Sequence, residues 1–187
     1  MILNDKSDSE RTDELPRTGS SIYKFNCSDE ETRAKMLKKY KRVNKYLIIP
    51  LYRIGLLPAI GFGRIFLLLK TQGRTTGKTR RTPMEYHWIN DVIHVFSARG
   101  EEADWIKNLR ANPDNVEVRH GFHWFHPKAE FVENRSEKID IFKWYVKKHS
   151  SAAKMLFGWN PKTDDPEKTN FSKLIDIITV VQLFRKS

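Results

Sequence analysis

Cysteine is nearly absent from this chain, which has Cys27 as its single thiol among 187 residues. A lone cysteine excludes an internal disulfide and any zinc site that needs several cysteines. The N-terminus also lacks the basic segment followed by an apolar core that marks a secretory signal. We therefore predict a cytoplasmic protein.

A long uninterrupted apolar run is missing as well. Residues 46–69 are strongly apolar and long enough to cross a bilayer, but Pro50, Arg53, Pro58 and Arg64 interrupt them. Prolines break a helix, and arginines are costly in hydrocarbon. This composition predicts a short helix, a loop and a buried strand rather than a transmembrane span.

Acidic residues are few relative to basic ones, with 23 Asp and Glu against 34 Lys and Arg and a formal net charge of +11. Such an excess predicts an anionic partner, which could be nucleic acid, an anionic membrane surface or a phosphorylated small molecule. Part of the charge is concentrated in residues 64–81, which hold six basic residues and no acidic one. The position of the charge, rather than its sum, must identify the partner.

The chain divides into a polar tail over residues 1–27, which we expect to be flexible, and one domain over residues 28–187. A capping box formed by Ser28 and Glu31 predicts a helix over residues 29–49. Its apolar residues fall on one face and are Met36, Tyr40, Val43, Leu47 and Leu51. The other face is basic.

The rest of the pattern predicts strands joined by short turns. The expected strands are 64–71, 80–88, 92–97, 116–120, 122–132 and 177–184, and the expected helices are 101–111 and 136–148. Asn90 and Asp91 predict a tight turn. Because strands and helices do not alternate, we predict an α+β protein: a split antiparallel β-barrel of about six strands, with an N-terminal helix and flanking helices.

The loop between the first two strands has the chemistry of an anion site. Gly73 and Gly77 allow the backbone to approach a ligand closely, and arginine binds phosphate or carboxylate in a bidentate manner. A P-loop is excluded, because three residues instead of four separate these glycines and a strand rather than a helix follows. A solvated hairpin tip is the alternative interpretation of the charge.

Two motifs around this loop resemble those of the deazaflavin-dependent nitroreductase family. Residues 71–84 are similar to the family's T-x-G-R-x-x-G-x-x-R-x-x-P-L run, and residues 105–113 to its W-x-x-N-L-x-A-N-P run. Residues 95–100 between them resemble the family's serine-and-glycine strand end. The resemblance covers residues 64–120. It implies a split β-barrel that binds coenzyme F-420, an 8-hydroxy-5-deazaflavin with a polyanionic tail, and transfers hydride to a quinone, an enone or a nitro compound.

The resemblance also implies a set of cofactor-binding residues. Arg74 and Arg80 match tail-binding positions, Ser97 matches a serine near the cofactor, and Asn108 matches a polar residue on the following helix. The full predicted set is Gly73, Arg74, Thr75, Lys78, Arg80, Pro83, Ser97, Ala98, Arg99, Gly100, Trp105 and Asn108. Thr75 and Ala98 replace lysines that are common in the family, and Arg99 lies next to the second of these positions.

Catalytic residues are not identified by the resemblance. Residues 149–159 lack the late tyrosines of nitro-reducing members, which leaves the substrate open. Ser97, Tyr86 and Tyr145 are the candidates for a hydrogen-bond or proton donor. We predict no metal site, because side chains alternate along a strand and His120, His123 and His126 would not converge.

Alternative functions follow from the same residues. The barrel could bind FMN, or it could bind an anionic or apolar ligand without catalysis. Nucleic acid is not predicted as a partner, because exposed aromatic residues are not interleaved with the basic hairpin. The predicted partners are a small-molecule acceptor and a second copy of the chain. The basic face of the helix over residues 29–49 predicts contact with anionic lipid at the inner face of the cell membrane, whereas its apolar stripe predicts packing on the barrel.

Overall fold

The computed structural model describes residues 14–185, so residues 1–13 of the predicted tail lie outside the described residues. The chain divides into two compact units. Of the described residues, 14–28 and 135–176 belong to the first unit, and 29–134 and 177–185 belong to the second.

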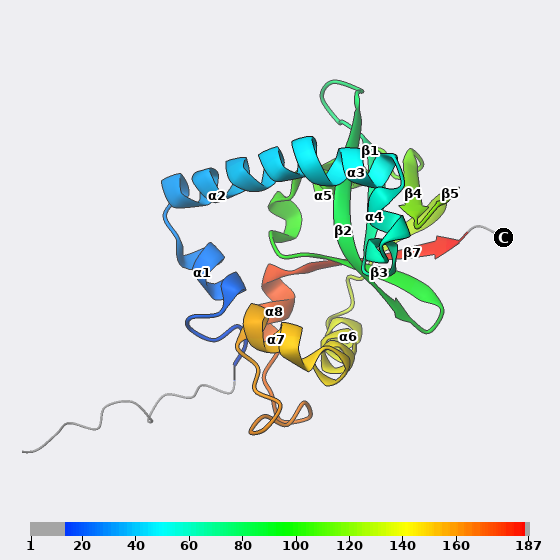
Figure 1. Cartoon of the computed structure of the whole chain (residues 1–187). Helices are drawn as coiled ribbons and strands as arrows, with labels where there is room; N and C mark the ends of the chain where they lie inside the picture. The colour runs from blue at the N-terminus through cyan, green and yellow to red at the C-terminus, as the bar shows by residue number, and fades with distance from the viewer. Residues whose placement is uncertain (1–13, 186–187) are drawn as a thin grey trace, which may run out of the picture. The chain divides into compact units, whose positions relative to one another are not determined.

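The second unit contains a seven-stranded antiparallel sheet with the order β5-β4-β1-β2-β3-β7-β6 (Figure 1). Its strands are β1 (Phe66–Gln72), β2 (Thr79–Ile89), β3 (Val92–Ser97), β4 (Val116–His120), β5 (His123–Phe125), β6 (Pro127–Phe131) and β7 (Thr179–Arg185). The sheet curls until β4 and β6 contact each other, which makes it a nearly closed barrel. The predicted α+β split barrel is confirmed.

The number of strands differs from the prediction for a local reason. The strand expected over residues 122–132 is two strands, because β5 pairs with β4 whereas β6 pairs with β7. The turn predicted at Asn90 and Asp91 is present, and both residues have positive φ angles, 49° and 60°. Such angles are typical of the two-residue turns that match the twist of a β-hairpin.

The barrel is filled by alternate side chains of its strands. Leu67 and Leu69 of β1 face the same apolar core as Val95 of β3 and Val181 of β7. Helix α5 (Asp104–Ala111) adds Trp105, Ile106 and Leu109 to this core. Burial of this helix against the barrel positions its polar residue Asn108, which the sequence predicted as part of the site.

The predicted helix over residues 29–49 is present as a longer helical segment. It consists of α2 (Glu30–Val43), a π-helical turn (Asn44–Ile48) and α3 (Ile49–Arg53). It begins differently from the prediction, because Asp29 is the N-cap and its carboxylate accepts a hydrogen bond of 2.8 Å from the Thr32 backbone N–H. The Ser28 hydroxyl instead donates to the Lys24 carbonyl.

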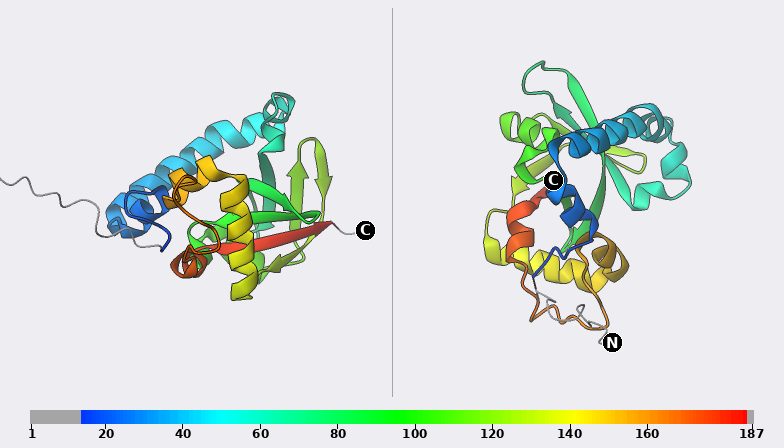
Figure 2. Two further views of the ribbon diagram at one scale, coloured as in Figure 1. Left: turned by 90° about the horizontal axis from the view of Figure 1, so that it is seen from below. Right: turned by 90° about the vertical axis from the view of Figure 1, so that its left-hand side faces the viewer.

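The predicted packing of this helix on the barrel is wrong for α2. No residue of α2 is buried, and the Tyr40 side chain of its expected apolar face is 61% exposed. In Figures 1 and 2, α2 extends away from the barrel, to which α3 joins it. The short α4 (Leu56–Ala59), a 3-10 turn (Phe62–Arg64) and β1 follow, which confirms the helix, loop and buried strand predicted for residues 46–69. Among residues 14–185, no helix has both the length and the apolar character needed to cross a bilayer.

The first unit is helical and consists of α1 (Ser21–Cys27), α6 (Arg135–Lys148), α7 (Ser150–Phe157) and α8 (Ser172–Ile177). Helix α6 matches the prediction, whereas α7 and α8 were not predicted. The described part of the expected tail belongs to this unit: Leu15 is fully buried, and the Arg17 guanidinium donates to the Asp164 carboxylate at 2.5 Å. The predicted flexible tail is therefore wrong for residues 14–27, and the single domain over residues 28–187 stays a prediction.

Candidate functional site

The connection between β1 and β2 is a closed loop that presents cations. The Gly73 N–H donates to the Lys78 carbonyl at 2.9 Å, and the Gly77 N–H donates to the Gly73 carbonyl at 2.8 Å. Gly77 has a φ of +64°, which favours glycine. Lys78 and Arg80 are exposed, and within the described part of the chain neither side chain forms a hydrogen bond or an ion pair. Their charges are available to an external anion.

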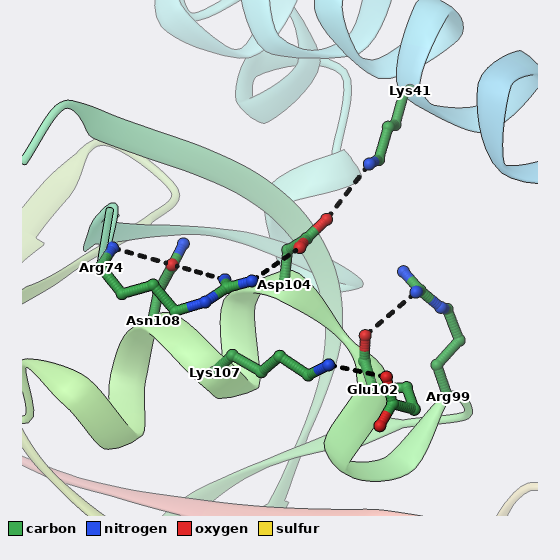
Figure 3. Close-up of polar contacts among 7 residues, drawn as sticks. All are labelled: Lys41, Arg74, Arg99, Glu102, Asp104, Lys107 and Asn108. Carbon is green, nitrogen blue, oxygen red and sulfur yellow. Dashed lines mark hydrogen bonds and ion pairs between the residues drawn. The ribbon is translucent and has the colours of Figure 1, made fainter. Parts of the chain in front are cut away.

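Arg74 is the one basic residue of this loop with a fixed orientation. Its backbone N–H and its Nη1 both donate to Oδ1 of Asn108, each at 3.1 Å (Figure 3). Asn108 lies on α5 and is only 5% exposed, so the barrel core holds the accepting oxygen in place. The two sequence motifs therefore meet in space through one residue of each.

Asp104 lies at the centre of a group of cations, which we call the basic cluster and which comprises Lys41, Arg74, Arg99 and Lys107. Its carboxylate is 3.1 Å from Nζ of Lys41 and 3.6 Å from Nη2 of Arg74 (Figure 3). Partial burial acts to raise the pKa of Asp104, but the hydrogen bond and charge of Lys41, with the charges of Arg99 and Arg74, hold that pKa below its usual value. Asp104 is therefore an ionised internal counter-ion of the basic cluster.

The turn after β3 carries Arg99 toward this cluster. The buried Ser97 hydroxyl donates to the Gly100 carbonyl at 3.0 Å. Gly100 has a φ of +52°, and a Cβ there would lie 2.5 Å from the carbonyl oxygen of Ile177. Arg99 donates to the Glu102 carbonyl at 3.0 Å, and Lys107 donates to the Glu102 carboxylate at 2.6 Å (Figure 3).

The remaining predicted cofactor-binding residues differ in how exposed they are. Thr75 and Ala98 are exposed, Pro83 of β2 is half-buried, and Trp105 is packed in the barrel core. Lys41 and Asp104 were not predicted as site residues. Asp104 directly precedes the second motif, which is a signal that could have identified it, whereas nothing local marks Lys41, since 63 positions separate it from its partner.

The two candidate tyrosines are not part of the basic cluster. Tyr86 is buried in the barrel near the end of β2 that lies away from the basic loop, and its hydroxyl donates to the Gly63 carbonyl at 3.1 Å and is 2.5 Å from Nε2 of His120. Burial raises the pKa of Tyr86 and lowers that of His120. Tyr145 belongs to the first unit, where it packs against His149 and Phe157.

The three histidines do not follow the predicted alternation, because a turn separates His120 on β4 from His123 on β5, and residues paired across a hairpin share one face of the sheet. His120 lies opposite His123 across the β4–β5 hairpin, and Nδ1 of His126 is 3.2 Å from the Val116 carbonyl oxygen. Within residues 14–185, no three His, Cys, Asp or Glu side chains are grouped so that they could hold a metal ion.

A cavity of about 360 Å³ adjoins the basic loop on the side of β4. Gln72, Gly77 and Thr79 form one wall, and Asp114 and Glu117 are among the residues of the other. Two carboxylates make this cavity unsuitable for a polyanion. The basic cluster, on the side of α5, is the better candidate.

A family model described as F-420H(2)-dependent quinone reductase matches residues 60–155, just over half of the chain. The chain belongs to this family. It is an F-420-dependent oxidoreductase whose cofactor is coenzyme F-420, which confirms the predicted enzyme class and cofactor. The match includes the basic loop, the turn after β3 and α5.

Solved structures of similar fold have low sequence identity to this reductase. An F420-H2 dependent reductase, FDR-A, is 22% identical, with 64% of this chain and 94% of that chain covered and a TM-score of 0.43. A putative pyridoxamine 5'-phosphate oxidase from Listeria innocua is 15% identical, with 72% and 92% covered and a TM-score of 0.44. A structure described as a domain-swapped dimer is 22% identical, with 64% and 80% covered and a TM-score of 0.44. No curated protein matches this chain in sequence.

Proposed function

We propose that this chain reduces a quinone-like acceptor and holds the polyanionic tail of coenzyme F-420 with the basic loop and the basic cluster. The observation that carries this proposal is the double hydrogen bond from Arg74 to the buried Asn108, which orients one guanidinium in advance beside the unpaired Lys78 and Arg80. Bound in its reduced form, the coenzyme supplies the hydride that the acceptor receives.

The residues present fit such a tail chemically. Phosphate and carboxylate groups bind cationic donors, and Arg74 and Lys78 of the loop and Arg80 at the start of β2 provide three of them, of which only Arg74 has an acidic neighbour among the described residues, Asp104. Each charge-assisted hydrogen bond is worth about 1.5–3 kcal/mol. Gly77 is exposed and has no side chain, so a ligand can approach the loop backbone there, whereas Gly73 is buried against the Lys78 carbonyl and allows the loop to close on itself.

The other predicted residues are proposed to line the ring or its linker. The Ser97 hydroxyl is buried and donates to the Gly100 carbonyl, so Ser97 supports the turn that carries Arg99. Arg99 and Lys107 extend the positive potential beyond Arg74. Thr75, Pro83, Ala98, Gly100 and Trp105 remain predictions as contact residues.

The predicted partners are part of the same proposal. An oxidised small molecule is the acceptor. A second copy of the chain stays a prediction, which size-exclusion chromatography with light scattering tests. Contact with an anionic membrane is supported by α2, because the helix carries basic residues and has no buried side chain.

Replacing Arg80 with alanine tests the assignment of the tail site. We expect Arg80→Ala to weaken deazaflavin binding at least tenfold, about 1.4 kcal/mol, in a fluorescence titration. Arg81→Ala is the matched control, because it removes the same charge from the next position of β2, where the side chain points to the other face. Equal dissociation constants for Arg80→Ala and the unmodified protein would refute the assignment.

A further inference from the structure

The segment from Thr32 to Met84 has an extreme charge. It contains 14 basic residues and no acidic one, whereas the whole chain has a net charge of +11. The basic loop accounts for only part of this excess. The remainder lies on α2, α3 and the helical turns around them, and on β1 and β2 next to the loop.

Large apolar side chains are exposed on the same segment. We call one group of them the apolar tip, which comprises Ile54, Leu56, Ile60, Phe62, Ile65 and Phe122, the last of which is distant only in the sequence. Ile54 is 75% exposed and Ile60 is 65% exposed. Soluble monomers rarely leave so many large apolar side chains together in water, and such a patch usually marks a contact with a partner or a membrane.

The apolar tip is a packed surface formed by two segments of the chain. Phe122, in the turn between β4 and β5, lies against Gly55, where a Cβ would be 3.0 Å from the Phe122 ring. A Cβ at Gly63 would likewise be 3.0 Å from the Gly121 Cα, so the two backbones are in close contact. Figure 1 shows α4 beside the β4–β5 hairpin. Two segments that are distant in sequence thus form one apolar end of the second unit.

Buried hydrogen bonds hold this end in place. Nη1 of the buried Arg119 on β4 donates to the carbonyls of Tyr52 and Arg53, both at 2.9 Å. The Tyr52 hydroxyl donates to the Phe66 carbonyl at 3.0 Å. The apolar side chains are therefore presented by a backbone that is tied to the barrel.

Cations flank the apolar side chains. Lys45, Arg53 and Arg64 are exposed and lie in the same stretch of chain as the tip. A shallow groove of about 460 Å³ along α2 contains Lys45 and adds three further cations over an apolar floor. Its residues are Ala34, Leu37, Lys38, Lys41, Arg42, Lys45 and Tyr46. Apolar groups bordered by lysine, arginine and tyrosine match the boundary between lipid chains and headgroups.

We infer that the apolar tip inserts into the headgroup region of an anionic membrane while Lys45, Arg53, Arg64 and the cations of α2 other than Lys41 bind lipid phosphates. Charge complementarity selects this occupant. A second copy of the chain would bring two strongly positive surfaces together, and nucleic acid would leave the apolar side chains uncovered. The inference deepens the membrane contact of the proposed function and does not depend on how the coenzyme is held.

Vesicle flotation of the full chain tests this inference. We expect binding to vesicles of phosphatidylcholine mixed with phosphatidylglycerol, and much weaker binding to phosphatidylcholine alone. The double variant Ile60→Ser/Phe62→Ser should bind the mixed vesicles roughly tenfold or more weakly, since burial of exposed apolar side chains is lost. Met155→Ser, which changes an exposed apolar residue of α7, is the matched control and should bind as the unmodified protein does.

The charged part of the surface is tested in the same assay. Arg64→Glu should weaken flotation with mixed vesicles, whereas Lys173→Glu, an exposed position in the first unit, should not. Added salt should weaken binding as well, because it screens exposed charges. Circular dichroism and a deazaflavin titration of each variant establish that the fold and the coenzyme site are intact.

Several results would overturn the inference. These are no flotation of the unmodified protein, equal flotation with both kinds of vesicle, and full flotation of the double variant. A dimer that the double variant disrupts would assign the tip to a second copy of the chain. Loss of coenzyme binding in the unmodified protein, with flotation intact, would refute the proposed reductase site alone.

Discussion

Arg74 shows how a single buried side chain can prepare a surface cation for binding. Asn108 accepts from both the backbone and the guanidinium of Arg74, and Asp104 pairs with the other end of that guanidinium. Freezing a long side chain costs conformational entropy, and here the protein has lost that freedom before a ligand arrives. The residue is thus oriented but remains partly exposed.

Replacing Asn108, the hydrogen-bond acceptor, should therefore weaken coenzyme binding although no positive charge is removed from the site. We expect Asn108→Ala to weaken coenzyme binding about tenfold, because the Arg74 guanidinium loses its fixed orientation and its backbone N–H loses its partner. Fluorescence titration measures the change. Asn115→Ala is the control, since the side-chain amide of Asn115 donates to Gln72 at the end of β1 and not to Arg74. Similar affinities for both variants would contradict this role of Asn108.

Asp104 should have the opposite effect, because it competes with the coenzyme for Arg74. We expect Asp104→Asn to tighten tail binding by roughly twofold to fivefold, a modest gain since both partners are partly exposed. The gain should shrink at high salt. With its pKa below the usual 3.8, Asp104 stays ionised at neutral pH, and its pairing is lost only as the pH falls through that lowered pKa. Weaker binding by Asp104→Asn would show that Asp104 supports the site instead.

At the scale of elements, the site depends on turns more than on strands. The basic loop joins β1 to β2, and the Ser97–Gly100 turn joins β3 to the helical region before α5. Each turn contains a glycine with positive φ, at Gly77 and Gly100. These backbone conformations place Arg74 and Arg99 beside α5, so the strands support the site from behind.

We expect that only glycine is tolerated at position 100. We expect Gly100→Ala to destabilise the protein by about 2–4 kcal/mol, because left-handed strain adds to the collision of the new Cβ with the Ile177 carbonyl. Thermal unfolding measures the loss. Gly121→Ala is a matched control with a similar φ of +60° and open space around the added Cβ. Equal losses for the two variants would mean that the collision contributes nothing.

At the scale of the whole molecule, the second unit is completed by the end of the chain. Strand β7 lies between β3 and β6, and residues 135–176 of the first unit separate it in sequence from the rest of the second unit. The positive charge is also unevenly distributed, since the charge of the segment from Thr32 to Met84 alone exceeds the net charge of the whole chain. Acidic residues elsewhere offset part of it. One unit of the protein thus carries both the proposed coenzyme site and the apolar tip.

Local patterns in the sequence determined the elements, and the resemblance of two motifs to a known family indicated the cofactor. The Asn90–Asp91 turn, the alternating strands and the glycines of the first motif depend on neighbours in the chain, so β2, β3, β4 and α6 could be predicted within a few residues. The same motifs indicated the deazaflavin family. Arg74 and Asn108 could be named as site residues because each lies within a motif.

Tertiary structure decided which of these residues meet and which surfaces remain uncovered. The bond from Arg74 to Asn108, the pairing of Lys41 with Asp104 and the burial of Leu15 each join segments far apart in the chain. The break between β5 and β6 depends on two different partner strands. The exposure of α2 and of the apolar tip depends on what the barrel leaves unpacked. Periodicity shows that a helix has an apolar face, but only the packed chain shows whether that face has a partner.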